Sequence, residues 1–122
     1  IMNRVDGKIA VVTGGTQGLG KAIAKKFAEL GARGIIICGR NKDNGGKVIN
    51  EITSETTVKA EYVEADLSEI QDCRLVIGQA DEVFGKIDIL VNAAGVTDRG
   101  NLLNTSEELF DKNFAVNTKA PF

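Results

Sequence analysis

Four short apolar segments recur along the chain and predict β-strands. They are rich in β-branched residues and cover residues 9–12, 35–38, 58–63 and 87–91. Successive segments begin roughly 25 residues apart, which leaves room for one helix and two short loops between strands. The first two segments are apolar throughout and are therefore expected to be buried on both faces of a sheet.

Apolar residues between these segments follow helical spacing. We expect helices over residues 18–30, 42–54 and 68–84, and a fourth that starts at Thr105. Ser68 with Gln71, and Thr105 with Glu108, have the spacing of capping boxes. The predicted packing stripes are Leu19, Ile23, Phe27 and Leu30; Val48, Ile49 and Ile52; Ile70, Cys73, Ile77, Ala80 and Phe84; and Leu109, Phe110 and Phe114.

Alternation of strands and helices predicts a Rossmann-type, doubly wound α/β fold with a parallel sheet covered on both faces. Right-handed crossovers give the strand order 3-2-1-4. Ligands of such sheets bind at the carboxyl ends of the strands where the order reverses, here between the first and fourth strands. The sequence contains no linker or repeat, so residues 1–122 are expected to form one domain.

Composition excludes several classes of function. The chain has 15 basic and 17 acidic residues and no histidine. It therefore lacks a basic field for nucleic acid or an acidic membrane surface, and an imidazole for Ser-His-Asp or Cys-His catalysis. No apolar stretch approaches the roughly 18 residues that span a bilayer, and residues 1–6 lack a secretory signal. We expect a cytoplasmic protein without a metal site, in which Cys38 and Cys73 are reduced core residues.

A glycine-rich turn, T-G-G-T-Q-G-L-G at residues 13–20, joins the first strand to the first helix. Glycines allow a pyrophosphate to approach the backbone, and free N–H groups at the helix start bind its charge. A turn that merely requires glycine is the alternative, whereas a P-loop is excluded because no Lys-Ser or Lys-Thr follows. The candidate cofactor residues here are Gly14, Thr16, Gln17, Gly18, Leu19 and Gly20.

This spacing, with Asp66-Leu67 after the third strand, residues 92–95 after the fourth and Asn117 in the last helix, resembles the short-chain dehydrogenase/reductase family. The likeness covers essentially the whole chain, although Ala93 stands where many members have a second asparagine. It implies an NAD(P)-binding domain and hydride transfer between a nicotinamide cofactor and a small carbonyl or alcohol substrate.

The resemblance also assigns roles to single residues. Asp66 would accept a hydrogen bond from the adenine amine with backbone help from Leu67, while Asn92, Ala94 and Gly95 would pass close to the cofactor. From the residues alone, Asp66 could equally be an ordinary turn residue, and the other three a tight strand-to-helix turn.

The second strand ends in Gly39-Arg40, where NAD-binding units usually place an acidic residue for the ribose 2′-hydroxyl. Arg40 can pair with a 2′-phosphate and stack on adenine, so we expect NADP rather than NAD. A solvent-exposed loop arginine is the alternative, and Gln17 stands where many NADP-preferring relatives have a basic residue. The missing carboxylate also argues against a methyltransferase.

Asn117 is the candidate catalytic residue. It shares a helix face with Phe110 and Phe114, so it is expected on a buried stripe. Pro121 offers no N–H to the carbonyl of Asn117, which predicts a local kink. The resemblance implies that this carbonyl holds a water of the proton relay; a buried asparagine that bonds neighbouring backbone is the alternative.

The family's Ser-Tyr-Lys set cannot be placed in this sequence, because Tyr62, the only tyrosine, is followed four positions later by Asp66. We therefore expect a cofactor-binding front portion, incomplete at its carboxyl end and inactive alone, of a family whose members run to roughly twice this length. The alternative is a non-catalytic dinucleotide-binding or assembly module. The fourth strand has only Asp88 to protect an exposed edge, so we expect either a further part of the chain or a second molecule to cover it. Residues 1–122 alone are therefore expected to form a homo-oligomer or to aggregate.

Overall fold

The computed structural model describes residues 4–122. Residues 1–3, which belong to the segment expected to lack a secretory signal, lie outside the described residues. Its strands form one parallel sheet of order β3-β2-β1-β4. The strands are β1 (Ile9–Thr13), β2 (Gly34–Gly39), β3 (Lys59–Glu64) and β4 (Ile89–Asn92). The helices are α1 (Gly18–Glu29), α2 (Lys42–Glu55), α3 (Ile70–Phe84) and α4 (Glu107–Phe114), which continues as a π-helical turn, η1 (Ala115–Lys119). The predicted fold class and strand order are confirmed.

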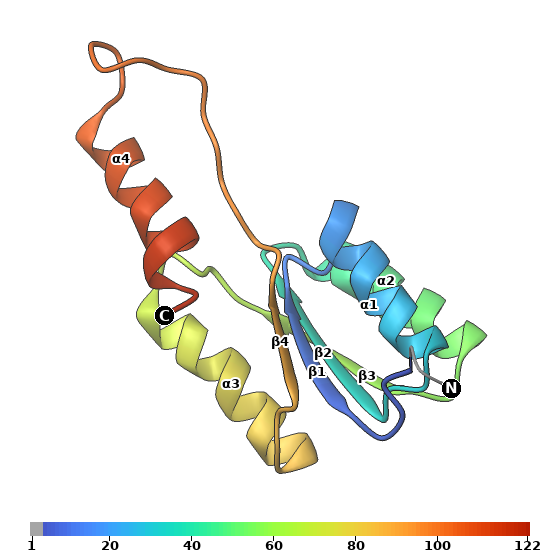
Figure 1. Cartoon of the computed structure of the whole chain (residues 1–122). Helices are drawn as coiled ribbons and strands as arrows, with labels where there is room; N and C mark the ends of the chain where they lie inside the picture. Colours follow the sequence, from blue (N-terminus) through green and yellow to red (C-terminus); the bar gives the residue numbers. More distant parts are fainter. Residues whose placement is uncertain (1–3) are drawn as a thin grey trace.

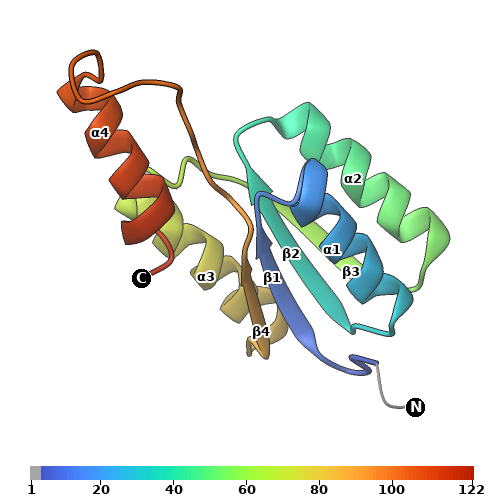
Figure 2. The ribbon, with the colours of Figure 1, turned by 45° about the horizontal axis from the view of Figure 1, so that its top comes forward.

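Helices cover both faces of the sheet (Figures 1 and 2). Helices α1 and α2 lie on one face and α3 on the other, while a long connection leads from β4 out to α4. The central strands β1 and β2 are buried along almost their whole length, as their continuous apolar sequence predicts. No helix in residues 4–122 combines the length and apolar composition that a membrane crossing requires.

The first helix contacts the sheet through smaller side chains than predicted. Its buried residues are Gly20, Ala24 and Ala28, whereas Leu19 of the predicted stripe is 72% exposed. Small residues allow the helix axis to approach the sheet, and this rotates the contact face by about one residue away from Leu19. Phe27 flanks that face as a partly buried neighbour of the core.

Both predicted capping boxes are wrong. Ser68 does not cap α3; its backbone N–H and its hydroxyl donate to Asp66 Oδ1, and Glu69 is the N-cap residue without a side-chain bond. The N-cap of α4 is Ser106, whose hydroxyl accepts from Leu109 N at 3.2 Å. In both cases a neighbouring polar residue offers the competing local hydrogen bond.

The last helix departs from the buried stripe expected for it. Phe110 and Phe114 stack with ring centroids 4.8 Å apart, but both are more than half exposed, and Asn117 is exposed too. The expected break in helical geometry is present as η1, where Ala120 N donates to Ala115 O, five residues back, at 2.8 Å. This wider turn comes just before Pro121, which cannot continue the α-helical bonds.

Candidate functional site

A hollow of about 320 Å³ lies where β1, β2 and β4 end, and we call it the glycine-turn hollow. Its position is the crevice that the strand order predicts. Every candidate cofactor residue except Asn92 lines it. These residues are Gly14, Thr16, Gln17, Gly18, Leu19, Gly20, Arg40, Asp66, Leu67, Ala94 and Gly95.

The glycine turn is tied to the end of β4. Thr13 is buried, and its hydroxyl donates to Val91 O at 3.4 Å and accepts from Ala94 N at 3.1 Å. This brings Ala94 so close to Gly14 that a Cβ on Gly14 would lie 2.8 Å from Ala94 Cα. Close packing within the protein therefore explains Gly14 whether or not a ligand is bound.

Gly18 differs from Gly14 because its free face is open. Its φ of 55° is in the left-handed region, and a Cβ there would have no neighbour within 4 Å. The residue opens α1 and lines the hollow, so a backbone without a side chain faces the space beside a helix N-terminus. This is the geometry that admits a pyrophosphate.

The end of β2 contacts the glycine turn. A Cβ on Gly39 would lie 3.0 Å from Thr16 Cγ2, so the two turns form one wall of the hollow. Arg40 stands on that wall, is exposed, and makes no ion pair within residues 4–122. No acidic side chain takes the place next to it at the end of β2.

Asp66 is the carboxylate of the hollow. Its Oδ1 accepts from Ser68 Oγ at 2.7 Å and from Ser68 N at 3.0 Å. These bonds, helped by the positive charges of Arg40 and Lys112, hold the pKa of Asp66 below its usual range. Oδ2 accepts nothing in the described part of the chain, so the ionised group retains an oxygen for a further donor.

Asn117 does not line the glycine-turn hollow. Its side chain accepts from Val96 N at 2.8 Å and donates to Val96 O at 2.7 Å, which fixes the chain just after Gly95. Val116 and Val96 line the hollow, and Asn117 does not. The structure thus shows Asn117 as a link between η1 and the end of β4, by the kind of backbone bonding that the alternative interpretation predicted.

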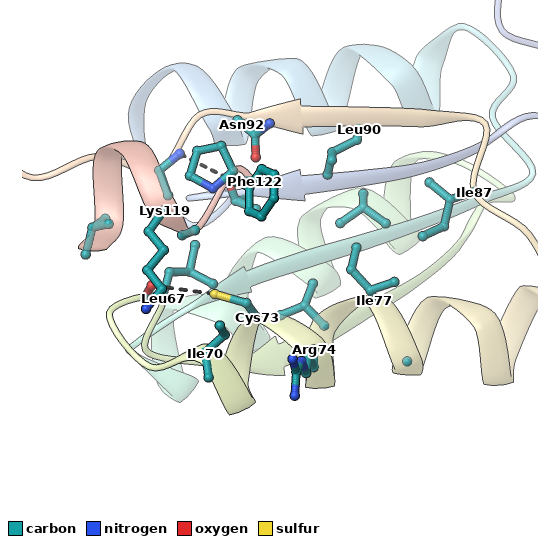
Figure 3. Close-up of a pocket in the computed structure, with 18 of the residues that line it drawn as sticks. Leu67, Ile70, Cys73, Arg74, Ile77, Ile87, Leu90, Asn92, Lys119 and Phe122 are labelled. Atoms are coloured by element: carbon teal, nitrogen blue, oxygen red, sulfur yellow. Dashed lines mark hydrogen bonds between the residues drawn. The ribbon is translucent and has the colours of Figure 1, made fainter. Parts of the chain in front are cut away.

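Asn92 faces a second, larger hollow between α3, β4 and the carboxyl-terminal residues, which we call the α3–β4 hollow (Figure 3). It measures about 840 Å³. Leu90 and Asn92 face Ile77 and Cys73 across it, and Cys73 Sγ donates to Leu67 O at 3.6 Å. It shares Leu67, Ala94 and Val116 with the glycine-turn hollow, but its walls are mainly apolar and include none of residues 14–20, so it does not have the features of a phosphate site.

Sequence reasoning missed several residues of the glycine-turn hollow. Lys112 and Val116 come from α4 and η1, and no local sequence pattern indicates that they line the hollow, because this depends on how α4 lies against the sheet. Cys38 also lines the hollow, but it belongs to the buried core, and this burial raises the pKa of its thiol to about 11. The other unpredicted lining residues are Gly39, Ala93 and Val96. Within residues 4–122 no cluster of acidic or thiol side chains has the arrangement of a metal site.

The parallel sheet and the glycine turn at its switch point define a Rossmann-type fold. The family model for the short chain dehydrogenases matches residues 8–122, so the chain belongs to the short-chain dehydrogenase family.

Among curated relatives, an uncharacterised oxidoreductase of Thermotoga maritima is 38% identical over 95% of this chain, and versicolorin reductase 1 of Dothistroma septosporum is 37% identical over 98%. The match covers 45% of each relative. This chain therefore spans slightly less than half the length of those proteins.

Solved structures show the same fold. L-sorbose reductase of Gluconobacter frateurii, complexed with NADPH and L-sorbose, superposes with a TM-score of 0.94 at 27% identity over 99% of this chain and 46% of that one. A metagenomic short-chain oxidoreductase in complex with NADP gives a TM-score of 0.88 at 36% identity over 96% of this chain and 52% of that one.

Proposed function

We propose that the glycine-turn hollow binds NADP(H), and that the chain is the cofactor-binding portion of an oxidoreductase acting on a small carbonyl or alcohol substrate. The observation that carries this proposal is the joint lining of one hollow by the open Gly18 backbone and Arg40, with no acidic residue at the end of β2. The two solved relatives named above, which were crystallised with NADPH and NADP, support it.

The residues present fit the parts of this cofactor. The turn at Gly18 and the start of α1 suit the pyrophosphate, Arg40 suits the 2′-phosphate, and the free oxygen of Asp66 suits the adenine amine. Bound NADP(H) would accept or supply the hydride. The protein's part is to hold the dinucleotide along the ends of β1 and β4, where Ala94 and Gly95 leave space.

Asn117 is proposed as the catalytic-site residue of this portion. Its side chain is engaged with Val96, and Pro121 provides no N–H for its main-chain carbonyl. A carbonyl without a helical donor can accept from a water, as the family resemblance implies. Tyr62 does not take part, because it lies in β3 with its ring against Gly45 of α2.

The test is a titration of the 122-residue protein with NADPH and with NADH, followed by cofactor fluorescence. We expect NADPH to bind more tightly, and Arg40→Asp to lower the NADPH-to-NADH affinity ratio by about tenfold or more, since a charge-assisted bidentate pair contributes about 1.5–3 kcal/mol. An unchanged ratio would overturn the cofactor assignment. NADPH oxidation in the presence of carbonyl compounds separates the oxidoreductase from the alternative, a non-catalytic dinucleotide-binding or assembly module.

We also propose self-association through β4. This strand is at the sheet edge, and Leu90 beside the α3–β4 hollow is 46% exposed. Light scattering should find oligomers, and Leu90→Lys should shift the population toward the monomer because a lysine opposes apolar contact. A monodisperse wild-type monomer would contradict this proposal.

A further inference from the structure

The glycine-turn hollow contains a basic residue, Lys112, to which the proposed function assigns no role. Among its lining residues, the charged ones are Arg40, Asp66 and Lys112, which leave one net positive charge. Arg40 comes from the turn between β2 and α2, whereas Lys112 comes from α4. Two separate elements thus bring cations to the hollow that Asp66 also lines.

Lys112 is not engaged elsewhere. No carboxylate lies within 4.0 Å of its ammonium group in residues 4–122, although Glu108 precedes it by one helical turn. Attraction to the negative carboxyl end of the helix does not fully explain the position of Lys112 either. The helix continues through η1, and Lys119 is nearer to its end. Lys112 lines the glycine-turn hollow together with Arg40 and Asp66, and its positive charge makes the smallest contribution to the lowered pKa of Asp66.

We infer that Lys112 is a second specificity-determining cation for the 2′-phosphate of NADP(H), acting from α4 while Arg40 acts from the end of β2. The glycine turn itself contributes no charge, because Gln17 is neutral. A cation in the hollow attracts any dinucleotide, but it favours the one with the additional phosphate more strongly. This inference rests on the proposed function and adds a residue to it.

The experiment compares Lys112→Met with Lys47→Met in the 122-residue protein. Lys47 is exposed on α2 and does not line the hollow, so its substitution makes the same change in net charge away from the site. Methionine keeps the apolar part of the side chain. Each variant is titrated with NADPH and with NADH at about 20 mM and about 300 mM salt.

We expect Lys112→Met to weaken NADPH binding about three- to fivefold, in the range of a solvent-exposed charge contact, and NADH binding by less than about twofold. The NADPH effect should shrink at the higher salt concentration, Lys112→Arg should restore affinity, and Lys47→Met should behave as wild type. Equal loss for both cofactors, or no loss, would overturn the inference.

Failure of the inference can be told from failure of the proposed function. If wild type binds NADPH and only the Arg40 variant changes the ratio, the proposed function stands and Lys112 has no such role. If wild type binds neither cofactor, the proposed function itself fails, and the inference fails with it. A thermal melt of each variant shows that the comparison is made between folded proteins.

Discussion

The two faces of the sheet differ in how completely they are covered. On the face of α1 and α2, Ile35 and Ile37 are fully buried. On the face of α3, Leu90 and Ile77 are more than two-fifths exposed around the α3–β4 hollow. The α1–α2 face is therefore closed, whereas the α3 face is closed over β1 and β2, where Val11, Ile36 and Cys38 are fully buried, and open beside β4.

The cofactor site that we propose lies on the boundary between these sides. Its glycine turn is held by the closed side, where β1 and β2 are buried, and by the contact of Gly14 with Ala94 at the end of β4. An apolar hollow beside an unpaired strand edge is a surface that proteins usually cover. The residues that we propose for cofactor binding are therefore positioned by the closed side, and the apolar surface beside β4 is the one through which we propose self-association.

The largest expected effect is a difference in cysteine labelling rate between two regions of the α3 side, the buried strand β2 and the α3–β4 hollow. Cys38 is fully buried and its thiol pKa is raised to about 11 by burial, while Cys73 is half-buried beside the α3–β4 hollow. With single-cysteine variants at about pH 8, a disulfide reagent should modify Cys73 at least about 10³-fold faster, because Cys38 reacts only after unfolding. Equal rates would mean that β2 is not closed.

Truncation of core side chains should give the next largest effect. Ile35→Ala removes a fully buried side chain and should lower the free energy of unfolding by about 2–5 kcal/mol. Leu90→Ala removes a half-exposed one and should cost about 1 kcal/mol or less. Urea denaturation at matched protein concentration measures both, and similar losses would contradict the comparison.

The closed side was also the better predicted one, for a physical reason. Continuous β-branched segments such as residues 35–38 have one stable placement, the centre of a parallel sheet, so the strands and their order followed from sequence. The stripe of α1 was misplaced because the closest contacts use Ala24 and Ala28, whose small side chains carry little apolar signal.

The open side was predicted less well because its side chains lack neighbours that fix them. Asn117 was expected in a buried stripe, but with Phe110 and Phe114 half exposed it bonds Val96, 21 residues away, a partner that no local pattern reveals. Lys112 was missed for the same reason, since its place in the hollow depends on how α4 lies against the sheet. The glycine turn could be predicted because its residues are contiguous.

Loss of the Asn117 link should have an intermediate effect that is local to the open side. Asn117→Ala removes both bonds to Val96, and each neutral hydrogen bond contributes about 1 kcal/mol, so stability should fall by about 1–2 kcal/mol. Hydrogen exchange of the Val96 amide should accelerate, while amides of β2 keep their protection relative to global unfolding. Asn117→Asp is a comparison variant: it keeps the acceptor for Val96 N, but it replaces the donor to Val96 O by a charged acceptor, so it should lose at least that second bond.

The smallest effect concerns Asp88, which joins the amino ends of β1 and β4. Its Oδ2 accepts from Ile9 N at 2.8 Å and lies 3.2 Å from Lys86 Nζ, and both interactions lower the pKa of the carboxyl group. Because the folded pKa is depressed, the contribution of Asp88 is present above the unfolded pKa of about 3.9 and disappears as the pH falls through the folded value. Asn at this position still offers an oxygen to Ile9 N but does not titrate.

Wild type should therefore exceed Asp88→Asn in urea midpoint at about pH 6, and the difference should vanish at about pH 2. The loss of Asp66 ionisation is common to both proteins and cancels in the difference. Asp98→Asn, on the exposed loop after β4 and without an ion pair in residues 4–122, is the matched control and should show no such pH-dependent gap. A gap for Asp88 that stays constant with pH would mean that shape or packing, rather than charge, makes this contact between the amino ends of β1 and β4.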